Sequence, residues 1–232
     1  MTPRKKMEPR SYEIDAVHCI DRTSATPRGA RRLLGSIRAF NRQIISAVRG
    51  TGQSLVTFRS AFVFYSDFWG NANASILETR FFDAMVEWKE VADETLRLEA
   101  ETSASGASSG LEALSIAMDA KWLIDVDKGR RLIFVWSNSP AHPLERAHSE
   151  RPPIYFRTGR AATDFASLGR AWDSMAASAR GSIILMCPDL YPWSVISKEW
   201  ANVVHFPSAA GKGLKGEAIE QVVEAAVLQF QD

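Results

Sequence analysis

The chain has little cysteine, no long hydrophobic run and almost no net charge, and each absence removes a class of protein. Its 232 residues hold two cysteines, Cys19 and Cys187, too few for a disulfide-stabilised scaffold and typical of free thiols in a reducing compartment. No apolar run approaches the roughly 20 residues that a membrane-spanning helix needs. The formal net charge of +1 supplies no global field toward nucleic acid or an anionic membrane. A cytoplasmic protein without nucleic-acid or membrane partners is therefore expected.

The first residues, MTPRKKMEPR, are basic, and the stretch that follows is not the apolar core of a signal peptide. It contains Glu13, Asp15 and His18. We expect a flexible tail over residues 1–11 and one domain over residues 12–232. Apolar residues make up 46% of the chain, which is enough for a full core in a single domain of this length.

Strand-like and helix-like hydrophobic patterns alternate along the chain. Segments rich in β-branched and aromatic residues predict strands at 12–20, 58–65, 76–82, 131–136, 182–187 and 202–206. Apolar residues spaced by three and four, with capping signals, predict helices at 27–50, 84–98, 109–122, 163–179 and 219–230. Because the strongest strands are continuously apolar and alternate with helices, we expect an α/β fold. It should be a doubly wound, mostly parallel sheet with helices on both faces, a Rossmann-like three-layer sandwich.

Polar residues follow three of the predicted strands. Asp21, Asn138 and Asp189 each come just after a strand ends. Ligands of parallel sheets bind outside the carboxyl ends of the strands, so these residues are expected on one rim, the carboxyl rim of the sheet.

A G-x-S-x-G motif supplies an enzymatic alternative. Gly106-Ala-Ser108-Ser-Gly110 is followed along the chain by Asp189 and His205, the order found in α/β serine hydrolases. Ser108 would be the nucleophile, His205 the base and Asp189 the group that orients it. The residues before Ser108 are small and polar instead of a strand, however, and the strained turn of such enzymes needs a strand there.

Two further motifs favour plain loops. The G-x-G-x-x-G of residues 211–216 occurs in the last strand–helix unit, whereas a dinucleotide fingerprint opens the first. His142 and His148 match no helical pair of zinc ligands and have no evident third ligand, so they are interpreted as histidines of a surface loop.

Four segments, taken together in this order and spacing, resemble the von Willebrand factor A (vWA) domains of bacteria. They are DRTSA at 21–25, FRSAFVFYSDF at 58–68, SGASSGLEALSIAMDAKW at 105–122 and GRRLIFVWSNSPAHPLE at 129–145. The resemblance covers roughly residues 12–206. It implies a vWA sandwich and a non-enzymatic role in protein binding or scaffolding.

In the vWA family a divalent cation occupies a metal-ion-dependent adhesion site on the carboxyl rim, and the resemblance implies a degenerate form of that site. Asp21 and Thr23 match its first two ligands, while Ala25 replaces a hydroxyl and Asn138 replaces an aspartate. A further hydroxyl would come from a later loop that contains Thr102, Ser103 and Ser105. Mg²⁺ is the one candidate cofactor, with Asp21, Thr23 and Asn138 as its ligands. Otherwise no cofactor is expected, and Asp21 and Thr23 would hydrogen-bond the turn and cap the helix.

The resemblance also implies where a partner binds. Another protein is expected on the part of the carboxyl rim formed by Asp21, Thr23, Ser24, Ser103, Asn138 and Ser139. Similar vWA proteins occur in bacterial multi-gene systems of the tellurium-resistance or defence type, and the same setting is expected here.

Overall fold

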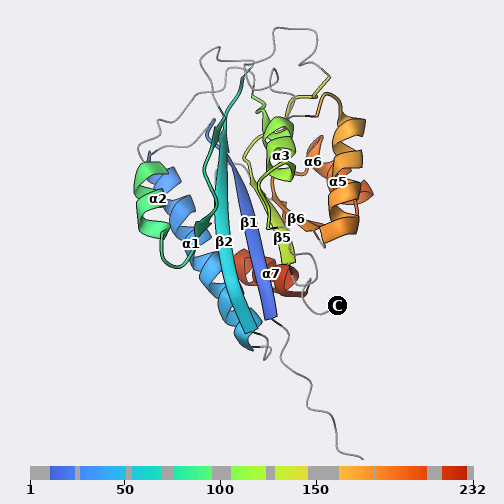
Figure 1. The fold of residues 1–232 in the computed structure, drawn as a ribbon. Helices are drawn as coiled ribbons and strands as arrows, with labels where there is room; N and C mark the ends of the chain where they lie inside the picture. The colour runs from blue at the N-terminus through green and yellow to red at the C-terminus, as the bar shows by residue number, and fades with distance from the viewer. Residues whose placement is uncertain are drawn as a thin grey trace, which may run out of the picture.

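A mostly parallel sheet forms the centre of the molecule (Figure 1). The computed structural model describes residues 11–23, 27–50, 54–68, 76–95, 106–123, 129–145, 162–179, 181–207 and 216–228. Within them the sheet has seven strands in the order β3-β2-β1-β5-β6-β7, and β4 also pairs with β2.

The long strands of this sheet all run in one direction. They are β1 (Ser11–Asp21), β2 (Ser54–Tyr65), β5 (Gly129–Trp136), β6 (Gly181–Met186) and β7 (Val203–His205). The short strands β3 (Leu77–Glu78) and β4 (Phe82–Asp83) pair antiparallel with β2. The predicted mostly parallel sheet is confirmed, and its first strand, β1, lies between β2 and β5.

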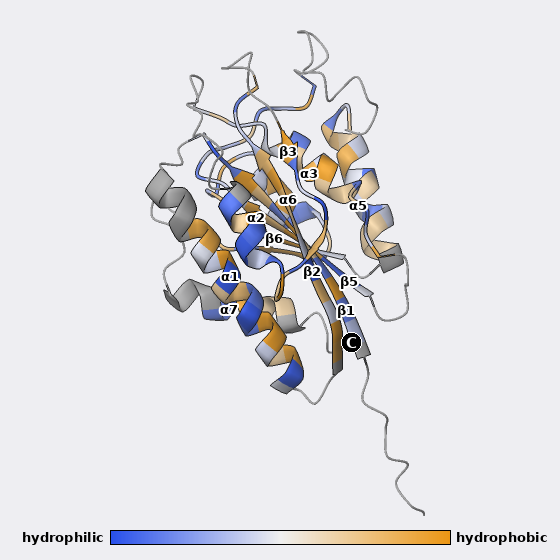
Figure 2. Ribbon diagram, turned by 60° about the vertical axis from the view of Figure 1, so that its left-hand side comes forward, coloured by the Kyte–Doolittle hydropathy of each residue, from blue (hydrophilic) through white to orange (hydrophobic). Residues whose placement is uncertain are grey.

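Helices cover both faces of the sheet, which completes the expected three layers (Figure 2). One face carries α1 (Pro27–Gly50), α2 (Trp88–Thr95) and α7 (Gly216–Leu228). The other carries α3 (Gly110–Met118), α5 (Phe165–Ala179) and α6 (Trp193–Glu199). No helix in the described ranges is long and apolar enough to cross a membrane.

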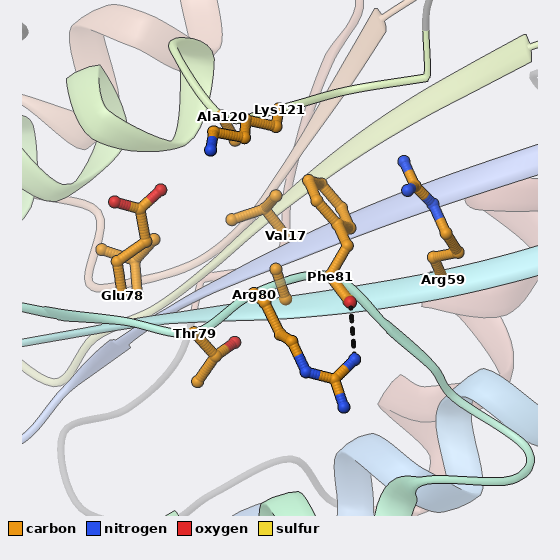
Figure 3. Close-up of a pocket in the computed structure, with 10 residues that line it drawn as sticks. Val17, Arg59, Glu78, Thr79, Arg80, Phe81, Ala120 and Lys121 are labelled. Carbon is orange, nitrogen blue, oxygen red and sulfur yellow. Dashed lines mark hydrogen bonds between the residues drawn. The ribbon is translucent and has the colours of Figure 1, made fainter.

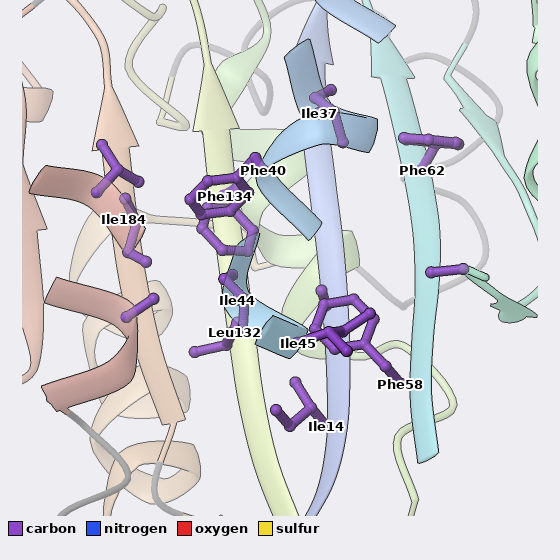
Figure 4. Close-up of a cluster of buried hydrophobic side chains, with 14 of the residues drawn as sticks. Ile14, Ile37, Phe40, Ile44, Ile45, Phe58, Phe62, Leu132, Phe134 and Ile184 are labelled. Atoms are coloured by element: carbon purple, nitrogen blue, oxygen red, sulfur yellow. The ribbon is translucent and has the colours of Figure 1, made fainter. Parts of the chain in front are cut away.

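The alternation of side chains along β2 explains the two cores. Successive residues of a strand point to opposite faces. Phe58, Phe62 and Phe64 therefore join the core under α1, while Ala61 and Val63 join the core under α3. Figure 4 shows the first core, where Phe40 of α1 meets Phe134 of β5 edge-on at 4.9 Å between ring centroids.

The structure differs from the sequence prediction at three places. Residues 76–82 were expected as one strand, but the segment contributes the two short strands β3 and β4. The helix α6 was not predicted. The S-x-x-E sequence of Ser109 and Glu112 predicts a capping box at the start of α3, and this prediction is wrong: the Ser109 hydroxyl accepts a bond from the Phe68 N–H (3.2 Å), and the Ser109 N–H donates to the Ser66 carbonyl (2.9 Å).

Candidate functional site: the carboxyl rim of the sheet

Asp21, the last residue of β1, is the centre of a hydrogen-bond network on the carboxyl rim. Its Oδ1 accepts from the Thr23 N–H (2.9 Å) and from the Thr23 hydroxyl (2.6 Å). Its Oδ2 accepts from the Ser137 and Ser139 hydroxyls, both at 2.7 Å. Ser137 and Ser139 follow β5, the neighbour of β1, so the parallel register itself brings them to Asp21. Four donors thus hold one buried carboxylate.

Two other ionisable groups lie beneath this network. Burial raises the pKa of Tyr65 well above its ordinary value, and the charge of Asp21 raises it further. Burial also raises the pKa of the Cys187 thiol well above its ordinary value, and the charge of Asp21 raises it further. Both groups are therefore neutral near pH 7.

The structure brings part of the expected rim together. Thr23 and Ser139 each donate a hydrogen bond to Asp21. Asn138 is exposed, and no described hydrogen bond joins it to Asp21. The remaining positions that the sequence assigned to the rim or the metal lie outside the described residues: Ser24, Ala25, Thr102, Ser103 and Ser105.

Ser137 is the member of the network that the sequence did not reveal. The resemblance to vWA domains pointed instead to its neighbour Asn138, which stands where the vWA pattern has an aspartate. The available signal was register: Ser137 directly follows β5, and Asp21 ends the adjacent parallel strand.

The described donors are a poor fit to a magnesium site. Mg²⁺ is held through carboxylate charge and keeps its waters tightly. Among the described residues of this network Asp21 is the single carboxylate, and each of its two oxygens already accepts two hydrogen bonds. In the described part of the chain no group of three His, Cys, Asp or Glu side chains is placed to hold a metal ion.

A second buried polar group lies at the start of α3. His142 Nε2 is 3.1 Å from Asp67 Oδ1, and both side chains are buried, so His142 is no surface-loop histidine as the sequence had indicated. Burial raises the pKa of Glu112 to about 8, and the charge of Asp67 adds to the shift. His148, which the sequence also placed in a surface loop, lies outside the described residues, as do residues 211–215 of the glycine motif.

The serine hydrolase triad does not assemble. Ser108 is fully buried, and its hydroxyl has no hydrogen-bond partner among the described residues. His205 Nε2 is instead 3.0 Å from the Cys187 carbonyl oxygen, and Asp189 is exposed. A nucleophile needs both a base within hydrogen-bond reach and access to substrate, and Ser108 has neither in this arrangement.

Beside the network the rim presents apolar side chains. Leu190 is 53% exposed and Tyr191 is 46% exposed, in the connection between β6 and α6. Trp193 of α6 anchors this connection, because its buried indole donates Nε1–H to the Ser139 carbonyl (3.1 Å). Large exposed apolar side chains on a fixed loop are typical of protein interfaces.

No protein-family model matches the sequence, and no curated protein matches it. Solved structures do share the fold. The vWF domain of the type V pili tip protein Mfa5 from Porphyromonas gingivalis aligns with a TM-score of 0.51 at 12% identity, over 95% of this chain and 97% of that one. The fold is of the von Willebrand factor type.

Two longer proteins contain the same vWA-like fold. The pilus adhesin SpaC from Lactobacillus rhamnosus GG, in its open conformation, aligns with a TM-score of 0.52 at 10% identity over 97% of this chain. Proximal thread matrix protein 1 from the mussel byssus aligns at 0.50 and 8% over 95% of this chain. This chain spans 30% of SpaC and 50% of the mussel protein. At these identities the likeness establishes the fold alone.

Proposed function

We propose that this vWA-like protein binds another protein through the carboxyl rim and acts as a scaffold without catalysis. The observation that carries the proposal is the exposure of Leu190 (53%) and Tyr191 (46%) beside the Asp21 network. Aromatic side chains on a preorganised surface contribute strongly to protein interfaces, because little conformational entropy is lost when they are covered.

The hydrogen-bond network supports a positioning role for the rim. Asp21 ties the turn after β1, through Thr23, to the turn after β5, through Ser137 and Ser139. Trp193 then ties Ser139 to α6. Three connections of the rim are therefore held relative to one another before a partner arrives.

We also propose that Mg²⁺ has no tight site on this rim, and that a partner is recognised through apolar and hydrogen-bonding groups instead of through a metal. The support is the saturation of Asp21 by its four donors. A partner carboxylate would gain little here, because without a cation Asp21 would repel it.

The setting is a further proposal. We propose a cytoplasmic protein that belongs to a bacterial multi-gene system of the tellurium-resistance or defence type. Its support is the resemblance of the four sequence segments, together with Cys19 and Cys187, which are buried free thiols. This setting can be tested by deleting the neighbouring genes of the host one at a time. The deletion that removes the bound protein identifies the gene of the partner.

Affinity capture with matched variants tests the rim. Leu190→Asp and Tyr191→Ser should each reduce the captured partner about tenfold, as expected when an interface anchor is lost. Val56→Asp is the control, since Val56 is 61% exposed near the opposite end of β2. If Val56→Asp removes the partner and the rim variants retain it, the interface lies elsewhere.

A further inference from the structure

Helix α1 concentrates positive charge in a chain whose net charge is +1. Its sequence contains no Asp, Glu or Lys, and every charged residue in it is an arginine. These arginines are Arg28, Arg31, Arg32, Arg38, Arg42 and Arg49. The charge of the molecule is therefore balanced as a whole but not along this helix.

Three of these residues form one exposed row, which we call the arginine stripe. Arg38, Arg42 and Arg49 are all exposed. At 3.6 residues per turn their side chains leave the helix within about 40° of one another, and they span about 16 Å of its axis. The arginine stripe is thus a straight line of guanidinium groups on the surface of α1.

The arginine stripe lacks the internal partners that arginines near the sheet have. Arg59 of β2 makes two hydrogen bonds to Asp15, at 2.8 and 2.7 Å. Arg80 donates to the Phe81 carbonyl at 3.2 Å, as Figure 3 shows. The three arginines of the stripe make no hydrogen bond, ion pair or ring contact with any residue that the structure describes.

This arrangement of charge is unfavourable for α1 by itself. Arg38 and Arg42 are four residues apart, and like charges at that spacing destabilise a helix. The first turn contains Arg28 and no acidic residue, although the helix dipole favours negative charge there. Sequence features that break local rules in this way are expected where a partner compensates for them.

The neighbouring helices limit how wide an anionic partner can be. Figures 1 and 2 both show α1 between α2 and α7. Glu90 and Asp93 are exposed on α2, and Glu220 and Glu224 are exposed on α7. A membrane surface or a nucleic-acid duplex would bring its negative charge over these carboxylates, whereas a narrow segment can lie along the stripe alone.

A nucleic-acid single strand is narrow enough, but it binds through bases stacked on aromatic rings as well as through its phosphates. Among the described residues Tyr191 is the one exposed aromatic side chain, and it lies in the connection between β6 and α6. The surface of α1 therefore favours a peptide over a nucleic acid.

We propose that the arginine stripe binds an acidic helix of a partner protein. A helix lying along α1 has the same rise per residue, so carboxylates four and seven residues apart would meet Arg38, Arg42 and Arg49 in turn. Arginine suits this role because its planar guanidinium can form two parallel hydrogen bonds with one carboxylate. The stripe is separate from the carboxyl rim, so the proposal does not depend on the function proposed above.

Fluorescence anisotropy with a designed peptide tests the proposal. The probe is a labelled, alanine-rich helical peptide of about 18 residues with glutamates at positions i, i+4, i+7 and i+11, which match the stripe in either direction. Titration with the full chain should give saturable binding that about 1 M salt removes. A peptide of the same composition with its glutamates distributed around the helix should bind about tenfold more weakly, because fewer of its carboxylates reach the stripe.

Variants of the stripe assign the binding to α1. Arg38→Gln and Arg42→Gln should each weaken the probe about three- to fivefold, and the triple change that adds Arg49→Gln at least about 25-fold. Arg42→Lys keeps the charge but loses the paired hydrogen bonds, so it should weaken the probe less than Arg42→Gln does. Arg170→Gln, which changes an exposed arginine of α5 on the opposite face, is the matched control and should leave the binding unchanged.

Two further probes examine the other anionic partners. Oligothymidylate of about 18 nucleotides and vesicles of phosphatidylcholine and phosphatidylserine in equal parts should both bind more weakly than the acidic peptide. If either binds more tightly and is released by the triple change, the stripe serves a nucleic acid or a membrane and the proposal is wrong. Absence of saturable peptide binding, equal binding of the two peptides, or full binding by the triple variant would also overturn it.

Discussion

Glu112 is a carboxyl group buried in α3 whose two oxygens have no hydrogen-bond partner among the described residues. Its pKa is raised by burial from 4.5 to about 8 in the folded protein. Below the unfolded pKa the group is neutral in both states and has no effect. As pH rises toward 8 the unfolded chain ionises first, so the folded state loses up to roughly 5 kcal/mol of relative stability.

Glu112→Gln should remove this loss while keeping the shape of the side chain. We expect the variant to gain stability over wild type as pH increases from about 5 to 8.5, by up to roughly 4 kcal/mol in the difference between the two ends. Urea denaturation at several pH values measures it. Glu90→Gln, an exposed change on α2, serves as the control and should show no such gain. A flat difference between Glu112→Gln and wild type would contradict the prediction.

His18 produces the opposite dependence on pH. Burial lowers its pKa from 6.5 to about 3, an effect that Asn41 partly offsets. The ring stacks on Phe134 at 4.8 Å, and its Nδ1 accepts from the Trp136 indole (3.3 Å). The folded state must keep His18 neutral, so stability is full above pH 6.5 and falls as pH decreases toward 3, by up to roughly 5 kcal/mol.

His18→Gln should be less stable than wild type at neutral pH, because it loses the stacking on Phe134. Its stability should fall less steeply between about pH 6 and 4, since no imidazole remains to bind a proton in the unfolded chain. Unfolding curves at these pH values compare the two slopes. An acid slope as steep in the variant as in wild type would assign the sensitivity to other groups.

Single residues also show how far the sequence could predict the rim. Asp21, Thr23 and Ser139 were expected on it, and the structure joins them. The direction of the Asn138 side chain was not predictable, because beyond the end of a strand the side-chain direction depends on the local turn and no longer alternates as in the strand. Neither was the pairing of His142 with Asp67, which depends on a contact between residues 75 positions apart.

At the scale of elements, the N-terminus of α3 is packed too closely for a larger residue. A Cβ at Gly110 would lie 2.7 Å from Cζ2 of Trp193, a rigid ring that is fully buried. Gly110→Ala should therefore destabilise the protein by about 1–3 kcal/mol, the usual cost of overpacking.

Gly35, in the middle of α1, is the matched control for that substitution. A Cβ there would meet no atom within 4 Å, so Gly35→Ala should stabilise the protein by about 0.5–1 kcal/mol through helix propensity. Urea denaturation of both variants gives the comparison. Equal effects of the two changes would show that the contact with Trp193 relaxes without cost.

Elements were predictable where their hydrophobic pattern was long. The 24 residues of α1 and the continuous apolar run of β5 gave strong signals. The two-residue strands β3 and β4 gave weak ones, because their extended form is set by pairing with β2. The seven residues of α6 include two buried side chains, Trp193 and Ile196, too few to reveal a period.

At the scale of the whole molecule, alternation of strands and helices was enough to predict the doubly wound sheet, because few chain paths cover both faces of parallel strands.

The melting temperature of the whole fold can show whether Mg²⁺ binds at the carboxyl rim. A ligand that binds only the folded state stabilises it by about 2.7 kcal/mol at 100 times its Kd. In a domain of this size each kcal/mol raises the melting temperature by roughly 2–4 °C.

Restoring the two positions at which the chain departs from the vWA metal motif should create a measurable response. We expect Mg²⁺ at saturation to raise the melting temperature of Ala25→Ser/Asn138→Asp by about 5–10 °C and to leave wild type nearly unchanged. The added carboxylate should matter more than the added hydroxyl, because charge dominates binding to a hard dication. Without metal the double variant should melt below wild type, since the carboxylate introduced at position 138 would repel Asp21. A shift in wild type as large as in the variant would show that the native rim already binds Mg²⁺. No shift in either protein would mean that the exposed direction of residue 138 keeps a carboxylate there from reaching a metal beside Asp21.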